Sequence, residues 1–219
     1  MIKGIYVITD TFLMPSRSHI DIAVAALYSG ASVIQMRDKT ASDKDLIRIG
    51  REIKRLASAT GALFIVNDRL EVALACDADG LHVGQDDHPA SELRSLIPGK
   101  ILGVSVSTPE EAARAKRDGA DYLGVGPIFA TSTKADAVPP IGPDAIKPIK
   151  SASGELPVVA IGGINESNLA EIAKSGADSA SVISAVVCAD DMAEATRRLV
   201  QAWDRATGGL GDGATIYSS

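Results

Sequence analysis

The sequence predicts a single (β/α)8 barrel of the α/β class, and three observations support this. Short apolar runs rich in Val and Ile alternate with longer amphipathic segments, a pattern typical of buried parallel strands and the helices between them. Eight such strand–helix units follow one another with no linker among them. Polar residues gather just after the carboxyl ends of the predicted strands, where a barrel assembles its site.

An open doubly wound sheet is the alternative arrangement of the same units. Strands about 4.8 Å apart would spread eight strand ends over roughly 34 Å of an open sheet. A closed barrel brings those ends to one mouth, so it is favoured if the polar residues form one site. The predicted strands span residues 4–9, 32–37, 62–67, 80–84, 101–106, 122–126, 157–162 and 179–184.

The predicted helices carry start and stop signals. Pro109 falls in a first helical turn, where the N–H that it lacks would have no partner in any case. The related segments SGAS, DGAD and SGAD each close a helix and open a strand. Gly30, Gly119 and Gly176 of these segments suit the left-handed residue after a helix. Three helix starts pair a cap with an acidic residue three positions on: Ser42 with Asp45, Thr108 with Glu111, and Asp191 with Glu194.

One barrel domain is expected over residues 1–206, and the Gly-rich segment 207–219 is expected to be a flexible tail. Hydrophobic residues make up 46% of the chain and aromatic residues only 4%. Ala, Val, Ile and Leu must therefore build most of the core. The formal net charge is −6, which argues against a general nucleic-acid binder because such a protein needs a basic face.

The cysteines and the N-terminus predict the compartment. Cys76 and Cys188 form no CxxC pair, so we expect two small buried residues in a reduced protein. The first apolar run is too short for a signal peptide, and no run approaches the ~20 residues of a membrane span. These features predict a cytoplasmic protein that binds neither membrane nor nucleic acid. The oligomeric state is left open, a homo-oligomer included.

The segment VIQMRDKT carries an unusual charge pattern. It begins as a buried strand, and then Gln35, Arg37 and Lys39 follow at every second position. Alternate residues of a strand point to the same side, so an amide, a guanidinium and an ammonium group should share one face. Two like charges side by side repel each other. An anionic partner is therefore expected opposite them.

Acidic side chains follow the third and fourth predicted strands. Asn67 and Asp68 end one strand, and Asp87 follows the next. Taken singly, Asp68 and Asp87 would be read as helix caps. Carboxylates from adjacent strands can also share a hard cation such as Mg²⁺, which takes a few carboxylates together with phosphate oxygens. Because they face the cationic segment, the pair favours a metal site.

The long loop 126–142 follows the sixth predicted strand and is rich in Thr, Ser and Pro. Thr131, Ser132 and Thr133 offer hydroxyl groups and backbone amides, and Lys134 adds a positive charge. Long loops in compact domains are usually functional or disordered. We expect an anion-binding lid, with a solvated surface loop as the alternative.

Two further strand ends carry weaker signals. Ser105 lies at the end of the fifth strand and, by itself, reads as a turn hydroxyl. Gly162 and Gly163 follow the seventh strand, where barrels commonly bind a phosphate on backbone amides. The three histidines form no triad or metal spacing. His82 is expected to be a packed strand residue, and no role is assigned to His19 or His88.

The ordered motifs YVITD, QMRDK, VND, GLHVGQDD, LGVS, GPIFATSTK, AIGGI and VISAV resemble the thiamine phosphate synthase family from about Tyr6 to about Trp203. The resemblance implies a (β/α)8 barrel and a Mg²⁺-dependent transferase of thiamine biosynthesis. Members join 4-amino-2-methyl-5-(diphosphooxymethyl)pyrimidine to 4-methyl-5-(2-phosphooxyethyl)thiazole and release diphosphate. Segment 143–150 lacks the Leu that often follows the loop glycine, a departure that touches no site position.

The resemblance also implies residue roles, carried over motif by motif. Arg37, Lys39, Ser105 and Lys134 would be catalytic. Asp68 and Asp87 would bind Mg²⁺. The pyrimidine diphosphate would be held by Gln35, Arg37, Lys39, Asn67, Ser105 and Lys134. The thiazole phosphate would be held by Thr131, Ser132, Thr133, Gly163, Ile183 and Ser184.

The implied chemistry agrees with the residue types. No side chain is an obvious nucleophile, whereas a departing diphosphate needs its developing charge stabilised by the metal and by Arg37, Lys39 and Lys134. If the C–O bond breaks first, as the family implies, the aminopyrimidine spreads the positive charge and the thiazole nitrogen captures it. The protein would position both substrates in a pocket that excludes water.

Two alternatives share the barrel. Thiazole tautomerases look similar, but they carry a His acid/base where this chain has Pro127. They also tend to lose the Q-x-R-x-K pattern and the paired Asp residues, both of which are present here. A non-catalytic phosphate-binding regulator is the other alternative, and the intact metal pair and lysine loop argue against it.

Overall fold

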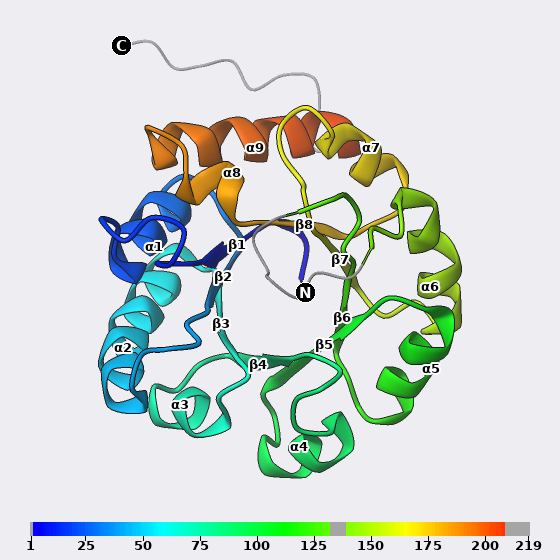
Figure 1. Ribbon diagram of the computed structural model, residues 1–219, viewed down its shortest axis with the longest axis horizontal. Coiled ribbons are helices and arrows are strands. Elements are labelled where there is room, and N and C mark those ends of the chain that lie inside the picture. Colours follow the sequence, from blue (N-terminus) through cyan, green and yellow to red (C-terminus); the bar gives the residue numbers. More distant parts are fainter. Residues whose placement is uncertain (1, 132–138, 209–219) are drawn as a thin grey trace.

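The eight strands close into one parallel barrel (Figure 1). The computed structural model describes residues 2–131 and 139–208 of the chain. Each strand pairs with its neighbour in sequence order, and β8 pairs with β1, so the predicted closed barrel is confirmed over an open sheet. The strands are β1 (Gly4–Thr9), β2 (Val33–Met36), β3 (Leu63–Asn67), β4 (Gly80–Val83), β5 (Ile101–Val106), β6 (Tyr122–Val125), β7 (Val158–Ile161) and β8 (Ser179–Val182).

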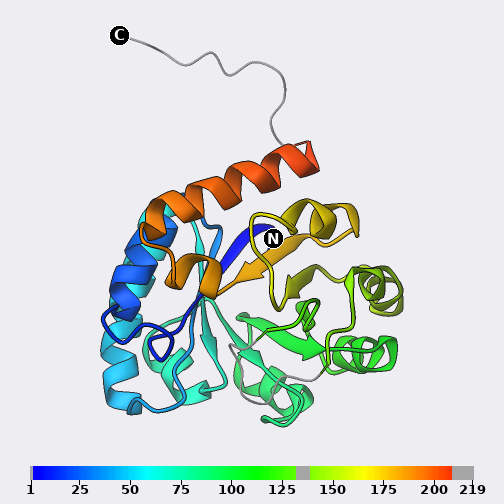
Figure 2. The same ribbon diagram turned by 45° about the horizontal axis from the view of Figure 1, so that its top comes forward.

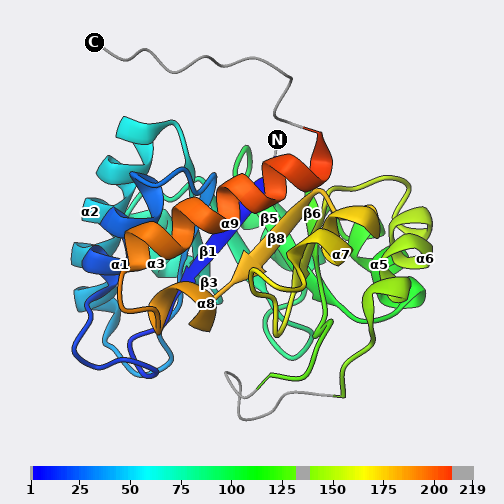
Figure 3. The same cartoon turned by 90° about the horizontal axis from the view of Figure 1, so that it is seen from above.

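The helices form a ring outside the strands (Figures 1 and 2). Two helices follow β8, and the second of them, α9, packs across the outside of β1 (Figure 3). A short 3-10 turn, η1 (Pro143–Ala145), precedes α6. The helices are α1 (His19–Leu27), α2 (Asp43–Thr60), α3 (Leu70–Ala75), α4 (Ala90–Leu96), α5 (Pro109–Arg117), α6 (Ile146–Ala152), α7 (Leu169–Lys174), α8 (Ser184–Val187) and α9 (Met192–Thr207).

The predicted local signals are confirmed. Ser42, Thr108 and Asp191 cap α2, α5 and α9, each accepting a hydrogen bond from the backbone N–H three positions on. Pro109 opens α5. All three glycines of the repeated segments have positive φ, between 88° and 96°, where a side chain would be strained.

One cysteine prediction is wrong. Cys76 is buried, as expected, but Cys188 is exposed. The reason is its position, because Cys188 is the residue that ends the four-residue helix α8, at its C-cap. Among the described residues, none belongs to a helix that is both long and apolar enough to cross a membrane.

A carboxylate triangle recurs at the amino ends of alternate strands. In three places an Asp lies just before a strand. Its carboxylate accepts the first or second backbone N–H of the previous strand in the chain, at 2.8–2.9 Å. The same carboxylate pairs with a basic residue of the helix that leads into that previous strand. Two of these Asp residues are the last letters of the segments DGAD and SGAD. The three sets are Asp79 with Phe64 and Lys54, Asp121 with Leu102 and Arg94, and Asp178 with Val158 and Lys150.

The triangle predicts a specific stability cost. Asp178→Ala removes the acceptor for the Val158 N–H and leaves Lys150 without its carboxylate. We expect the free energy of unfolding to fall by about 1–3 kcal/mol, because a buried donor loses its partner. Glu166→Ala breaks an exposed ion pair with Arg198 that holds no backbone group, and it should cost less than about 1 kcal/mol. Chemical denaturation measures both, and equal costs would contradict the proposed role of the triangle.

Candidate active site

A cavity of about 320 Å³ opens at the carboxyl ends of the strands. Residues that follow different strands meet in it, as expected for a barrel mouth. Ser132, Thr133 and Lys134 lie outside the described residues. Every other residue assigned to the site from the sequence lines the cavity: Gln35, Arg37, Lys39, Asn67, Asp68, Asp87, Ser105, Thr131, Gly163, Ile183 and Ser184.

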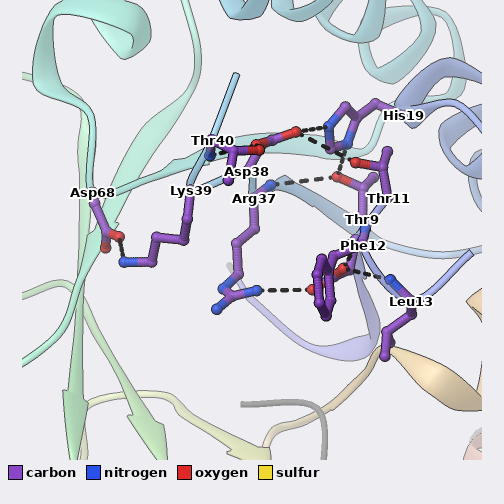
Figure 4. Close-up of polar contacts among 11 residues, drawn as sticks. Thr9, Thr11, Phe12, Leu13, His19, Arg37, Asp38, Lys39, Thr40 and Asp68 are labelled. Atoms are coloured by element: carbon purple, nitrogen blue, oxygen red, sulfur yellow. Dashed lines mark hydrogen bonds and ion pairs between the residues drawn. The ribbon is translucent and has the colours of Figure 1, made fainter. Parts of the chain in front are cut away.

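The two cations after β2 each face a carboxylate of the protein itself. Arg37 pairs with Asp10 at 2.8 Å, and Lys39 pairs with Asp68. Figure 4 shows the two side chains reaching in different directions, Lys39 toward Asp68 and Arg37 toward the segment after β1. An anionic partner opposite the cations was expected. The structure supplies two carboxylates, one from each neighbouring strand end.

Asp10 holds Arg37 and the turn after β1 at the same time. One oxygen of this buried carboxylate accepts the backbone N–H groups of Phe12 and Leu13, at 2.9 and 3.2 Å. The other oxygen accepts from Arg37 Nη1. The Nε atom of Arg37 is buried and has no hydrogen-bond partner among the described residues. Because a guanidinium carries five N–H donors, this side chain is oriented by one carboxylate and retains donors for an anion.

A second cluster holds the backbone between Arg37 and Lys39 (Figure 4). The Arg37 N–H donates to Thr9 Oγ1 at 3.3 Å, and Thr9 Oγ1 lies 2.6 Å from His19 Nδ1. His19 Nε2 lies 3.2 Å from Asp38 Oδ2. The sequence assigned no role to His19, and the structure corrects this. Its imidazole is buried and links the end of β1 to the segment after β2.

Asp38 completes this clamp. Its Oδ1 accepts the backbone N–H groups of Thr40 and Ala41, both at 2.8 Å. Burial works to raise the pKa of Asp38, but these hydrogen bonds and the one from His19 outweigh it and leave the pKa well below its usual range. The carboxylate therefore stays ionised and fixes the turn that carries Lys39.

The Asp68 and Asp87 carboxylates are close enough to affect each other's ionisation. Burial raises the pKa of Asp68, and the nearby Asp87 adds to the rise against the opposing effect of Lys39. For Asp87, burial is outweighed by hydrogen bonds with Asp68 and with the Gly84 N–H, so its pKa is lowered. Neither residue caps a helix, since Arg69 and Pro89 occupy the cap positions of α3 and α4. The helix-cap alternative is therefore wrong.

The carboxylate pair fits a magnesium ion. Two like charges held together in a partly buried wall are stabilised by a cation, and Mg²⁺ commonly takes one or two carboxylates while water and phosphate oxygens fill the other positions. No cluster of three or more His, Cys, Asp or Glu residues arranged to hold a metal occurs among the described residues. Asp68 and Asp87 could hold such an ion only together with further oxygen ligands, such as water or a phosphorylated substrate.

A chain of hydrogen bonds crosses the barrel beneath the cavity. Gln35 Nε2 donates to the Tyr6 hydroxyl at 2.6 Å, and this hydroxyl lies 3.0 Å from that of Tyr122. The Tyr122 hydroxyl lies 2.8 Å from His82 Nδ1, and His82 Nε2 lies 2.9 Å from Ser105 Oγ. His82 is thus more than the packed strand residue that the sequence predicted. It joins two polar neighbours inside the barrel.

The glycine pair after β7 is required by the protein's own packing. Gly163 has φ of +65°, and a Cβ atom there would lie 2.6 Å from the Ala130 carbonyl oxygen and 2.8 Å from Phe129 Cβ. The Phe129 N–H donates to the Gly162 carbonyl at 3.0 Å. The sequence attributed the close approach at these glycines to a phosphate. The structure shows that the loop after β6 already occupies the Cβ side of Gly163.

Some residues in and around the cavity were missed from the sequence. Asp10 and His19, which support the cavity without lining it, gave no signal, because their partners Arg37 and Asp38 lie in the next strand–helix unit. Tyr6 and Tyr122 could have been found, since both occupy inward strand positions in a chain with few aromatic residues. Ser181 of β8 also lines the cavity, and its hydroxyl is buried with no partner among the described residues.

The chain is similar to proteins of known family along most of its length. The sequence model of a family described as thiamine monophosphate synthase matches residues 5–186. A thiamine-phosphate synthase of Chloroflexus aurantiacus is 52% identical, over 89% of this chain and 90% of its own length. One of Methanospirillum hungatei is 51% identical, over 89% and 95%. The solved thiamine phosphate pyrophosphorylase of Pyrococcus furiosus superposes with a TM-score of 0.84 and 41% identity, over 93% of this chain and 96% of its own.

The clamp at His19 should contribute to stability. His19→Leu removes the partner of both the Thr9 hydroxyl and the Asp38 carboxylate. We expect the free energy of unfolding to fall by about 1–3 kcal/mol, because two polar groups lose a hydrogen bond in a largely buried setting. His88→Leu, at an exposed position, should change stability by less than about 0.5 kcal/mol. Urea denaturation tests the pair, and a neutral His19→Leu variant would contradict the clamp.

Proposed function

The chain belongs to the thiamine monophosphate synthase family, and we propose from this premise that its cavity binds a pyrimidine diphosphate beside a thiazole phosphate and joins them. The activity is that of a thiamine-phosphate synthase, a transferase. The observation that carries the proposal for the site is the meeting of Arg37 and Lys39 with the Asp68–Asp87 pair in one cavity. Cations and a metal-binding carboxylate pair at one mouth suit a diphosphate.

The diphosphate would lie between Arg37 and Lys39. The buried Nε of Arg37 would donate a hydrogen bond to this anion. Its lack of a partner among the described residues supports this role. A guanidinium is well suited to paired phosphate oxygens. Lys39 now contacts Asp68 and would exchange that contact for phosphate oxygens. Gln35, Asn67 and Ser105 would hold the pyrimidine, and Lys134 would reach the diphosphate from the loop after β6.

Mg²⁺ would be held by Asp68 and Asp87. When bound, it would neutralise charge that develops on the departing diphosphate. The chain's own part is to keep both carboxylates in place. The Gly84 N–H holds Asp87 at 2.7 Å, and Asn67 holds Asp68 at 2.7 Å.

The thiazole phosphate would bind on the opposite wall of the cavity, after β6, β7 and β8. Gly163, Ile183 and Ser184 line the cavity there, together with Thr131. Backbone amides and the Ser184 hydroxyl are suitable donors to a phosphate. Ser132 and Thr133 would add hydroxyl groups. This arrangement would direct the thiazole nitrogen toward the carbon that loses diphosphate.

The reaction requires charge stabilisation and positioning rather than a protein nucleophile. The bond between the pyrimidine methylene carbon and the diphosphate oxygen breaks, and its electron pair leaves with the diphosphate. Arg37, Lys39 and Lys134 stabilise that developing charge. The electron-rich aminopyrimidine spreads the remaining positive charge, and the lone pair of the thiazole nitrogen forms the new C–N bond. A cavity closed to water protects the cation from hydrolysis.

A coupling assay tests this function. The protein, both phosphorylated substrates and Mg²⁺ should yield thiamine phosphate with an equal amount of diphosphate. A thiazole tautomerase would instead isomerise a thiazole carboxylate phosphate without diphosphate release, and a regulator would bind phosphates without turnover. Two phosphorylated small molecules are thus the proposed partners, and the cytoplasmic location stays a prediction.

The metal assignment predicts a strong loss of activity. Asp68→Ala and Asp87→Ala each remove a proposed ligand, so kcat/KM should fall by about 100-fold or more, because several kcal/mol of charge stabilisation depends on the ion. Both variants should remain folded by circular dichroism. Asp43→Ala, which changes an exposed carboxylate on α2 outside the cavity, is the control and should keep activity. Full turnover in excess chelator would sink the assignment.

The two anion sites should be separable by mutation. Arg37→Ala should raise the Kd of the pyrimidine diphosphate by about 10- to 100-fold, because a charged hydrogen-bond donor is lost. Ser184→Asp places a negative charge on the proposed thiazole phosphate wall and should chiefly weaken that ligand. Calorimetric titration of each variant with each substrate checks the map. If both variants lose the same ligand, the two-site arrangement is wrong.

A further inference from the structure

The hydrogen-bond chain at the base of the cavity runs through five strands. Its first member, Gln35, presents its amide nitrogen to the Tyr6 hydroxyl, so Tyr6 accepts there. The Tyr6 and Tyr122 hydroxyls lie 3.0 Å apart, and either could donate to the other. If Tyr6 gives its single proton to Tyr122, then Tyr122 is left to give its own proton to His82 Nδ1, 2.8 Å away. In that arrangement each hydroxyl accepts on one side and donates on the other.

The direction sets the state of the imidazole. In a neutral imidazole one nitrogen donates and the other accepts. If Nδ1 accepts from Tyr122, the proton of a neutral His82 resides on Nε2 and is donated to Ser105 Oγ, 2.9 Å away. The Ser105 hydroxyl proton would then be directed away from His82, toward the cavity that Ser105 lines. In the opposite direction, Ser105 would give its proton to His82 and offer a ligand only lone pairs.

Two glycines leave space in the barrel interior for this hydrogen-bond chain. A Cβ atom at Gly103 of β5 would overlap both the Tyr122 ring and His82 Nδ1. A Cβ atom at Gly124 of β6 would lie 2.8 Å from His82 Cε1 and 3.2 Å from His82 Nε2. Both glycines sit beside the ring that transmits the direction. Any other residue at either position would push His82 away from its partners.

The two phenols keep their protons. Tyr6 and Tyr122 are almost fully buried, and burial raises the pKa of each well above the usual value. Their rings are held 6.3 Å apart between centroids, and the Tyr122 ring lies 5.4 Å from that of His82. The two phenols of the chain therefore stay neutral over the ordinary pH range.

We propose that Tyr122 is a positioning residue that holds His82 as its Nε2–H tautomer and thereby makes the Ser105 hydroxyl a hydrogen-bond donor to the ligand. The ligand atom must then be an acceptor, such as a ring nitrogen of the pyrimidine, and this identification rests on the proposed function. Tyr122 also lines the cavity, but the role proposed for it acts through His82 and Ser105. Its phenol matters because it sets which partner receives the serine proton.

The tautomer can be read directly by ¹⁵N NMR of the imidazole rings in the ligand-free protein. The chain has three histidines, and His82→Gln identifies the resonances of His82. At a pH of about 8, above the usual imidazole pKa, we expect a protonated Nε2 and an unprotonated Nδ1. Tyr122→Phe should convert this single state into a mixture or into the Nδ1–H form. Tyr28→Phe, at an exposed position outside the barrel interior, is the matched control and should leave the tautomer unchanged.

A double-mutant cycle separates positioning from packing. Tyr122→Phe should lower kcat by about tenfold, the effect of one misdirected hydrogen bond. In a Ser105→Ala background the same change should have little further effect, because the two residues act in one chain. Additive losses would show that Tyr122 acts by packing alone and would overturn the proposal. A protonated Nδ1 in the unmutated protein would also overturn it, and this result is decisive even if Tyr122→Phe fails to fold or the coupling assay shows no activity.

Discussion

The pairing of β8 with β1 is the contact on which the site depends. It closes the barrel through the register from Gly4 opposite Ser179 to Val7 opposite Val182, and closure brings all eight carboxyl ends to one mouth. In an open sheet the residues after β2 and those after β8 would lie at distant points of the edge. The cationic wall and the proposed phosphate wall face one cavity only because these two strands are paired. The carboxylate triangles at Asp79, Asp121 and Asp178 stabilise the other end of the same ladder.

Charges at the mouth are balanced before any ligand arrives. Arg37 and Lys39 would repel each other if unpartnered, and Asp10 and Asp68 remove that cost. The two pairs differ in permanence. Asp10 is buried and also holds a turn, so its contact with Arg37 belongs to the scaffold. Lys39 is more than half exposed, and its partner Asp68 also interacts with Asp87. The Lys39–Asp68 contact is therefore suited to exchange for a ligand. The site thus combines a rigid guanidinium with an adaptable ammonium group.

The interior below the mouth is polar where most barrels pack aliphatic side chains. Tyr6, Gln35 and Tyr122 are buried there with their hydrogen bonds satisfied by one another, which keeps the desolvation cost low. Gly103 and Gly124 provide the space. A connected network of this kind links the buried tyrosines through His82 to Ser105, which lines the cavity.

The sequence by itself determined the strand–helix alternation, the helix caps, the barrel class and the residues at each strand end, because these depend on periodicity and on neighbours within a few positions. It also predicted a shared site for Gln35, Arg37 and Lys39, and all three line the cavity, although Arg37 and Lys39 lie beyond the end of β2 and reach in different directions. Tertiary structure alone decided what each group contacts: Asp10 against Arg37, His19 between Thr9 and Asp38, and Tyr122 against His82. It also turned Cys188 outward and placed the Cβ side of Gly163 against Phe129. These partners lie 10 to 40 residues apart in the chain, and a hydrogen bond requires a distance and an angle that no local pattern encodes.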